Sequence, residues 1–173
     1  ARTFMNLISS FKAERLIAQI RGEADPTSAS AKHAFDKLRQ VGPAAVPKIL
    51  QALTTADRRQ TTEFVAVLAR LTDDKSLPVM LQGLADANPK TVSGVTSALS
   101  SSRKFNPNRI VDLLAEDNYS KSAVVDILLA HQDRLNVNHL LSQAYTLQPN
   151  EKNAVFRMIK ELAREDQVPD LVA

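Results

Sequence analysis

The segment Val46-Pro47-Lys48-Ile49-Leu50 decides the fold, because similar apolar blocks begin at residues 77, 110, 137 and 168. Successive blocks therefore start 31, 33, 27 and 31 residues apart. A second series consists of Leu38, Leu68, Leu99, Leu128 and Ile159, with steps of 30, 31, 29 and 31 residues. Two series with one period indicate a repeated unit of two elements, and a period in this range is typical of solenoids.

The spacing of apolar residues within each unit predicts helices throughout. Strand signals are lacking, so we expect an all-α fold. The expected helices span about 3–21, 29–40, 43–54, 56–71, 74–85, 89–101, 107–116, 119–132, 136–147 and 149–164. In the first helix, Phe4, Leu7, Ile8, Phe11, Leu16, Ile17 and Ile20 are expected to form a single apolar stripe. The helix 136–147 is unusually polar, which is typical of a solvated face and less often of a binding groove.

We expect residues 1–25 to form an N-terminal capping helix and residues 26–173 to form a single domain of four and a half repeats. The repeats span about 29–54, 56–86, 88–117, 119–148 and 149–173. A cap is favoured over a membrane-surface helix because a solenoid needs a terminal element to cover its core. The chain starts at Ala1 and stops inside an expected helix, so we expect it to be a piece of a longer protein.

Composition limits the possible classes of protein. Apolar residues make up 44% of the 173 residues and aromatic residues only 5%, which suits closely packed helices. The chain has no Cys, which excludes disulfides, thiolate metal sites and Cys nucleophiles. No apolar run approaches the roughly 20 residues of a membrane-spanning helix, and no signal peptide is evident. From these features we expect a cytoplasmic protein.

The stretch AFDKLRQVGPAAVPKILQAL, residues 34–53, resembles a HEAT repeat, in particular the short bacterial type also seen in phycobilin lyases. The second repeat matches through Leu68 and residues 77–84, the fifth through residues 168–171, and the third and fourth by period and apolar placement alone. The resemblance implies a right-handed α-solenoid (an armadillo-like superhelix) of stacked antiparallel helix pairs. Proteins of this family usually act as scaffolds, adaptors or binding arms.

The same resemblance places the second helix of each pair on a concave face. Aligned by the period, these helices present two rows of outward positions, at residues 48, 79, 112 and 139 and at residues 51, 82, 115 and 142. The candidate binding residues are Lys48, Gln51, Val79, Gln82, Asp112, His139 and Ser142. We expect this face to bind a protein or peptide and to position or regulate an attached domain.

Catalytic and metal-binding patterns are weak. The three histidines, His33, His131 and His139, lack the clustered partners that a metal site needs, although His131 and His139 are close in sequence. Paired carboxylates such as Asp73-Asp74 fall at helix ends or turns, where capping explains them. No phosphate loop or nucleophile elbow is present. We therefore expect no enzyme activity, no cofactor, no metal and no small-molecule site.

Two alternatives remain open. Basic groups at Lys12, Arg15, Arg58-Arg59 and Arg103-Lys104, with Lys48 and Arg109, suggest a nucleic-acid-binding HEAT-like module. The net charge of +3 is too small to imply nucleic acid by itself. The second alternative is a subunit of a lyase or modifying enzyme built on a HEAT scaffold, which would need a pocket lined by titratable groups.

Overall fold

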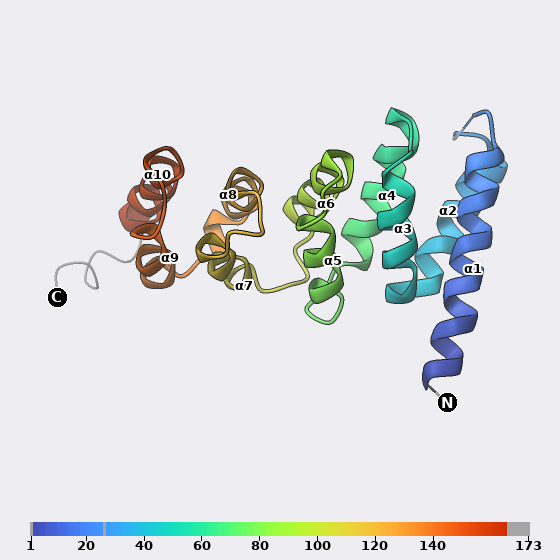
Figure 1. Ribbon diagram of the computed structural model, residues 1–173, viewed down its shortest axis with the longest axis horizontal. Coiled ribbons are helices and arrows are strands. Elements are labelled where there is room, and N and C mark those ends of the chain that lie inside the picture. Colours follow the sequence, from blue (N-terminus) through green and yellow to red (C-terminus); the bar gives the residue numbers. More distant parts are fainter. Residues whose placement is uncertain (1, 26, 166–173) are drawn as a thin grey trace. The chain divides into compact units, whose positions relative to one another are not determined.

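The computed structural model describes residues 2–25 and 27–165, and every regular element in these ranges is helical (Figure 1). The all-α prediction is therefore confirmed. The elements are α1 (Arg2–Gly22), α2 (Ala29–Val41), η1 (Gly42–Ala45), α3 (Val46–Leu53), α4 (Arg58–Leu71), α5 (Leu77–Leu84), α6 (Pro89–Ser101), α7 (Asn108–Val111), η2 (Asp112–Ala115), α8 (Lys121–Ala130), η3 (Gln132–Arg134), α9 (Val137–Ala144) and α10 (Pro149–Glu165). The expected block at Val168 lies outside the described residues.

Polar side chains set the starts of several helices. The hydroxyl of Ser28 accepts a hydrogen bond from the amide of Ala31 at the start of α2. Asp57 and Gln60 form a reciprocal capping box at the start of α4. The helix expected from residue 74 begins only at Leu77, because Asp73 and Ser76 bond to each other's backbone amides and hold a turn. The helix expected over 107–116 is one α-helical turn, α7, followed by the 3₁₀ segment η2.

The chain divides into two compact units, residues 1–105 and residues 106–173. This boundary falls inside the expected third repeat, between α6 and α7. In unit 1, consecutive helices pack in pairs, α1 with α2, α3 with α4 and α5 with α6. The pairs also contact one another through α2 and α4, α4 and α6, and α3 and α5.

The core of unit 1 contains the apolar residues that recur with the repeat period. Leu38, Leu68 and Leu99 of the second series are fully buried, and the rings of Phe35 and Phe64 join α2 to α4 edge to face with centroids 5.3 Å apart. The buried Gly83 lets α5 approach its neighbours closely, since a Cβ there would lie 2.9 Å from side-chain atoms of Leu50 and Val95.

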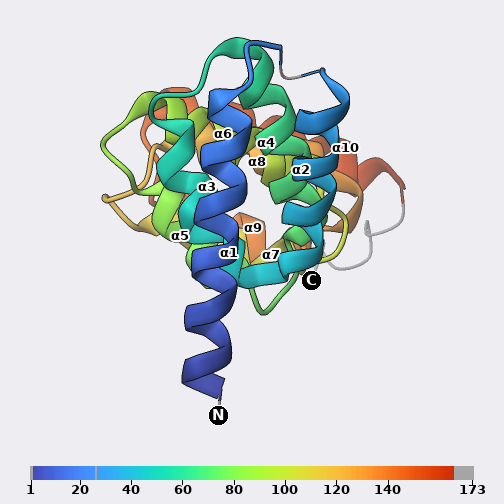
Figure 2. The same cartoon turned by 90° about the vertical axis from the view of Figure 1, so that its right-hand side faces the viewer.

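The single apolar stripe expected along α1 is wrong. Leu16, Ile17 and Ile20 are buried against unit 1, whereas Leu7, Ile8 and Phe11 are exposed by 53%, 53% and 64%. Figure 2 shows the N-terminal end of α1 extending past the ends of α2 and α3. The side chain of Phe4, also assigned to the stripe, lies outside the described part.

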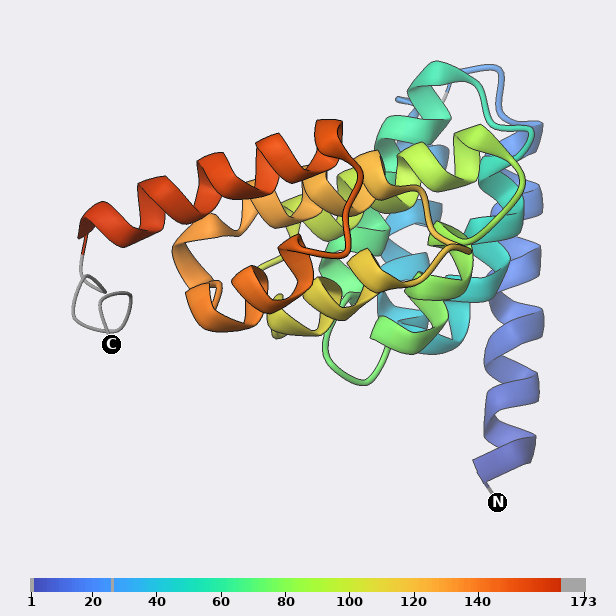
Figure 3. The same ribbon diagram turned by 60° about the vertical axis from the view of Figure 1, so that its left-hand side comes forward.

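Unit 2 pairs its helices in the same order. The helical stretch of α7 and η2 packs against α8, and α9 packs against α10. Figure 3 shows α10, in red, running beside α8, and α10 also packs against the shorter α9. The series residues Leu128 and Ile159 are buried here, and so is His131, which is fully enclosed at the end of α8.

Candidate functional site

Four of the seven predicted binding residues lie on one surface of unit 1. Helices α1, α3 and α5 form this surface, which contains two hollows of about 590 and 310 Å³. Both hollows are lined by Gln51 and Thr54, so they adjoin, and we call them together the α1–α3–α5 groove. Lys48 lines the larger hollow, and Val79 and Gln82 line the smaller one.

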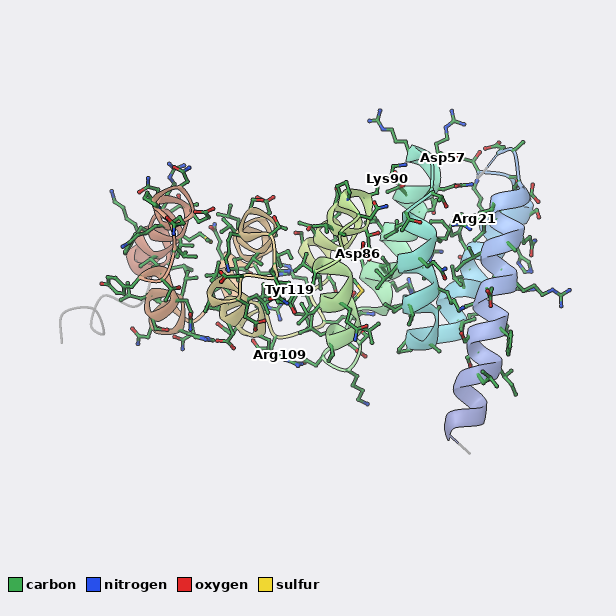
Figure 4. The ribbon with its side chains drawn as sticks, viewed as in Figure 1. Arg21, Asp57, Asp86, Lys90, Arg109 and Tyr119 are labelled. Atoms are coloured by element: carbon green, nitrogen blue, oxygen red, sulfur yellow. The ribbon has the colours of Figure 1, made fainter. Side chains whose placement is uncertain are left out.

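The larger hollow is framed by charged groups held in fixed contacts. The Lys48 ammonium lies 3.5 Å from a carboxylate oxygen of Glu14 on α1. The Arg21 guanidinium, labelled in Figure 4, donates to the hydroxyl of Thr55 at 2.7 Å and to the carbonyl of Ala52 at 3.3 Å. These contacts tie α1 to the end of α3 and leave both positive and negative charge along one edge of the groove.

Two side-chain amides line the groove, Gln51 in both hollows and Gln82 in the smaller one. Gln51 and Gln82 are exposed, and within the described part of the chain no hydrogen bond occupies either side-chain amide. Each amide offers an acceptor oxygen and two donor hydrogens. The smaller hollow adds the apolar side chains of Pro47, Leu50 and Val79. The groove therefore combines unengaged amides with an apolar floor, which suits a ligand that presents both peptide groups and apolar side chains.

The remaining predicted residues meet in unit 2. The Nε2 atom of His139, on α9, lies 2.6 Å from a carboxylate oxygen of Asp112, at the start of η2. The Ser142 hydroxyl donates to the backbone carbonyl of His139 at 2.7 Å. The Ser142 hydroxyl donates to the backbone and not to the His139 ring. Ser142, His139 and Asp112 therefore do not form a hydrogen-bonded chain of nucleophile and base.

The histidines do not converge on a metal. His131 is buried, while His139 is partly exposed and engaged by Asp112. Across the described ranges, no group of three His, Asp or Glu side chains is arranged to hold a metal ion. In the same ranges, no helix combines the length and apolar character needed to cross a bilayer.

One of the paired carboxylates noted in the sequence, Asp73, has a structural role. Asp73 accepts hydrogen bonds from the backbone amides of Lys75 and Ser76, at 3.0 and 2.8 Å. The bond from the Ser76 amide is the main reason why the pKa of Asp73 lies below its ordinary value of 3.8. Asp166 of the pair Glu165-Asp166 lies outside the described residues.

Sequence reasoning missed the contribution of α1 to the groove. Glu14, Ala18 and Arg21 line the larger hollow, although α1 was expected only to cap the core. Their spacing of four and three residues puts them on one helix face, which is a signal that the sequence already contained.

A third hollow, of about 700 Å³, lies between α4 and α6, where the Lys90 ammonium donates to the carbonyl of Ala56 at 3.3 Å (Figure 4).

No protein family, curated protein or solved structure matches this chain in the comparisons made with each.

Proposed function

We propose that this chain is a protein-interaction module, a scaffold or adaptor, that binds an extended peptide segment in the α1–α3–α5 groove. The observation that carries this proposal is the pair of exposed amides, Gln51 and Gln82, which lie at equivalent positions of successive repeats and line adjoining hollows. An amide side chain pairs with both the N–H and the C=O of an extended main chain, so it supplies affinity without requiring a particular ligand sequence.

Selectivity would come from the groups around the amides. Pro47, Leu50 and Val79 offer an apolar surface to one side chain of the ligand. Glu14, Lys48 and Arg21 place both signs of charge along the larger hollow, which favours a ligand segment that carries complementary charges. The Asp112–His139 surface of unit 2 is a second proposed contact region, and we propose that ligand binding positions or regulates an attached domain.

We further propose that the helices from α2 onward form HEAT-like repeats of a right-handed solenoid, with α1 covering the first repeat. Two observations support this architecture. The apolar blocks recur with steps between 27 and 33 residues, and the leading residues of the described blocks, Val46, Leu77, Ile110 and Val137, are all buried. Within unit 1, equivalent helices contact each other in order, α2 with α4 and α4 with α6.

The proposal is tested with a peptide selected from a random phage-displayed library against the full chain. We expect Gln51→Ala/Gln82→Ala to weaken binding of that peptide by about tenfold or more, since two hydrogen-bonding groups are lost. Lys48→Ala should also weaken binding, by a smaller factor. Fluorescence anisotropy measures the affinities, and the melting temperature of Gln51→Ala/Gln82→Ala is expected to change by less than about 2 °C because these two positions are exposed.

Gln40→Ala is the matched control, because Gln40 is an exposed glutamine of α2 that lines neither hollow. Its affinity for the peptide should equal that of the wild-type chain. Failure to select any peptide, or an affinity unaltered by Gln51→Ala/Gln82→Ala, would refute the groove as the binding surface. Steeply salt-sensitive retention on DNA that survives the double substitution would favour the nucleic-acid alternative.

A further inference from the structure

The N-terminal half of α1 carries an apolar face that points away from the unit it belongs to. Phe11, exposed by 64%, and the fully buried Ile20 are nine residues apart. At about 100° per residue, nine residues place two side chains on opposite sides of a helix. Leu7 and Ile8 flank Phe11 on the same side, and each is exposed by 53%. The core of unit 1 is thus on one side of α1, and these three side chains are on the other.

The charge around this face is positive. In the printed sequence no Asp or Glu precedes Glu14, whereas Lys12 directly follows Phe11. Lys12 and Arg15 are exposed, and Arg15 follows Phe11 by four residues, one helical turn further along the same face. Glu14 is engaged by Lys48 at 3.5 Å. The apolar side chains of this face therefore lie next to Lys12 and Arg15. The acidic residue nearest to these cations in the sequence, Glu14, already has Lys48 as its partner.

The size and the charge of the face favour one kind of occupant. A stable protein interface buries about 800 Å² on each partner, far more than three half-exposed side chains provide. A second copy of the chain would bring Lys12 and Arg15 against the same cations. A membrane surface requires neither a large area nor a complementary shape, because a few aromatic and aliphatic side chains enter the interface while basic residues contact anionic headgroups.

We propose that the face formed by Leu7, Ile8, Phe11, Lys12 and Arg15, the outer face of α1, binds an anionic lipid surface, with the helix lying in the plane of the interface. The N-terminal end of α1 extends past the ends of α2 and α3 (Figure 2), and the exposed side chains of Leu7, Ile8 and Phe11 are accessible to a flat surface. The contact is interfacial, since α1 is not apolar enough to span a bilayer.

The first experiment uses the absence of tryptophan from the chain. Phe11→Trp places a single fluorophore on the outer face, and Leu129→Trp places one at an exposed position of α8, where the native residue is 42% exposed. Vesicles of phosphatidylcholine with about 30% phosphatidylglycerol are added to each full-length variant. We expect a blue shift and quenching by brominated lipid for Phe11→Trp, and neither for Leu129→Trp. The absence of any shift for Phe11→Trp would overturn the proposal.

The second experiment measures vesicle flotation. We expect Leu7→Ser/Phe11→Ser to lower partitioning by about tenfold or more. Lys12→Gln/Arg15→Gln should remove the preference for anionic over neutral vesicles. Leu129→Ser is the matched control, and circular dichroism verifies that every variant keeps its helix content. Equal flotation of wild type and Leu7→Ser/Phe11→Ser would contradict the proposal. A dimer in sedimentation analysis that Leu7→Ser/Phe11→Ser dissolves would instead assign the face to self-association.

Discussion

At the scale of the residue, the backbone of Gly42 shows how a single position sets the connection between two helices. Its φ of +80° is the one positive value among the described residues, and it lies where α2 passes into η1. Glycine is needed at this position because other residues rarely adopt this conformation.

Gly42→Ala is expected to lower the free energy of unfolding by about 1–2 kcal/mol, because the methyl group strains the backbone. Gly22→Ala provides the control. A Cβ would meet nothing within 4 Å at either site, but Gly22 has no positive φ. Gly22→Ala should therefore be neutral or slightly stabilising. Urea denaturation measures the free energy of unfolding of both variants. Equal values would show that alanine at position 42 does not strain the backbone.

Asp73 gives the chain a pH-dependent contribution to stability. Because the pKa of Asp73 is lower in the folded chain than its ordinary value of 3.8, folding favours the ionised form. The contribution is complete above that ordinary value and is lost as the pH falls through the folded pKa. The difference in urea midpoint between wild type and Asp73→Ala should therefore be larger at about pH 7 than at about pH 3.

Ser76→Ala separates the two halves of this interaction. The variant loses the hydroxyl but keeps the backbone amide that bonds to Asp73, which is the main cause of the lowered pKa. Its stability should retain most of the pH dependence of the wild type over the same range, because the Ser76 hydroxyl is a smaller cause of the lowered pKa. If Asp73→Ala differs from wild type by the same amount at both pH values, the carboxylate of Asp73 has no role in acid sensitivity.

The repeat period predicted which residues of the repeats share a row, but it gave no prediction for residues of α1. Aligning the repeats put Gln51 and Gln82 in one row and Val79, Asp112 and His139 in the other. The structure adds that Gln51, Val79 and Gln82 line one groove and that Asp112 and His139, 27 residues apart, lie within hydrogen-bond distance. The contribution of Glu14 and Arg21 was not predicted, because α1 precedes the first repeat and has no counterpart in the series.

At the scale of the element, one asparagine joins two short helices of unit 2. The Asn108 side chain accepts a hydrogen bond from the backbone amide of Asn136 at 2.7 Å and donates to the backbone carbonyl of Arg134 at 3.2 Å. Asn108 is at the start of α7, and Asn136 caps α9. Helices of four and eight residues are too short to be stable alone, so such links contribute to their stability.

Asn108→Ala is expected to lower the free energy of unfolding by about 1–3 kcal/mol, because two backbone groups lose their partners. Hydrogen exchange at the amide of Asn136 should become faster in the same variant. Asn138→Ala, at an exposed position of α9, should change stability by less than about 0.5 kcal/mol. Unchanged exchange at Asn136 would show that the link does not hold the start of α9.

The expected helices match the observed ones closely, because apolar spacing and capping residues act locally. The side of α1 that is buried was not predictable in this way. An apolar pattern shows that a face is unsuited to water, but it does not say which body covers that face, and Leu7 and Phe11 are covered by none of the helices of unit 1.

At the scale of the whole molecule, the two units differ in charge. Unit 1 contains fifteen Lys and Arg against nine Asp and Glu, whereas unit 2 contains seven against ten. The sequence showed this gradient but not the boundary, since the spacing of the apolar blocks continues across residue 105. The basic unit is also the one that carries the outer face of α1, in agreement with an anionic surface as its ligand.

The pairing of α3 with α4 and of α5 with α6 has a consequence for engineering the array. The segment 29–54 contains α2 and α3 but lacks α1 and α4, the helices against which they pack. The segment 42–71 contains η1, α3 and α4 and so brings its own internal interface with it. Duplicating residues 42–71 would therefore carry the α3–α4 interface intact into both copies.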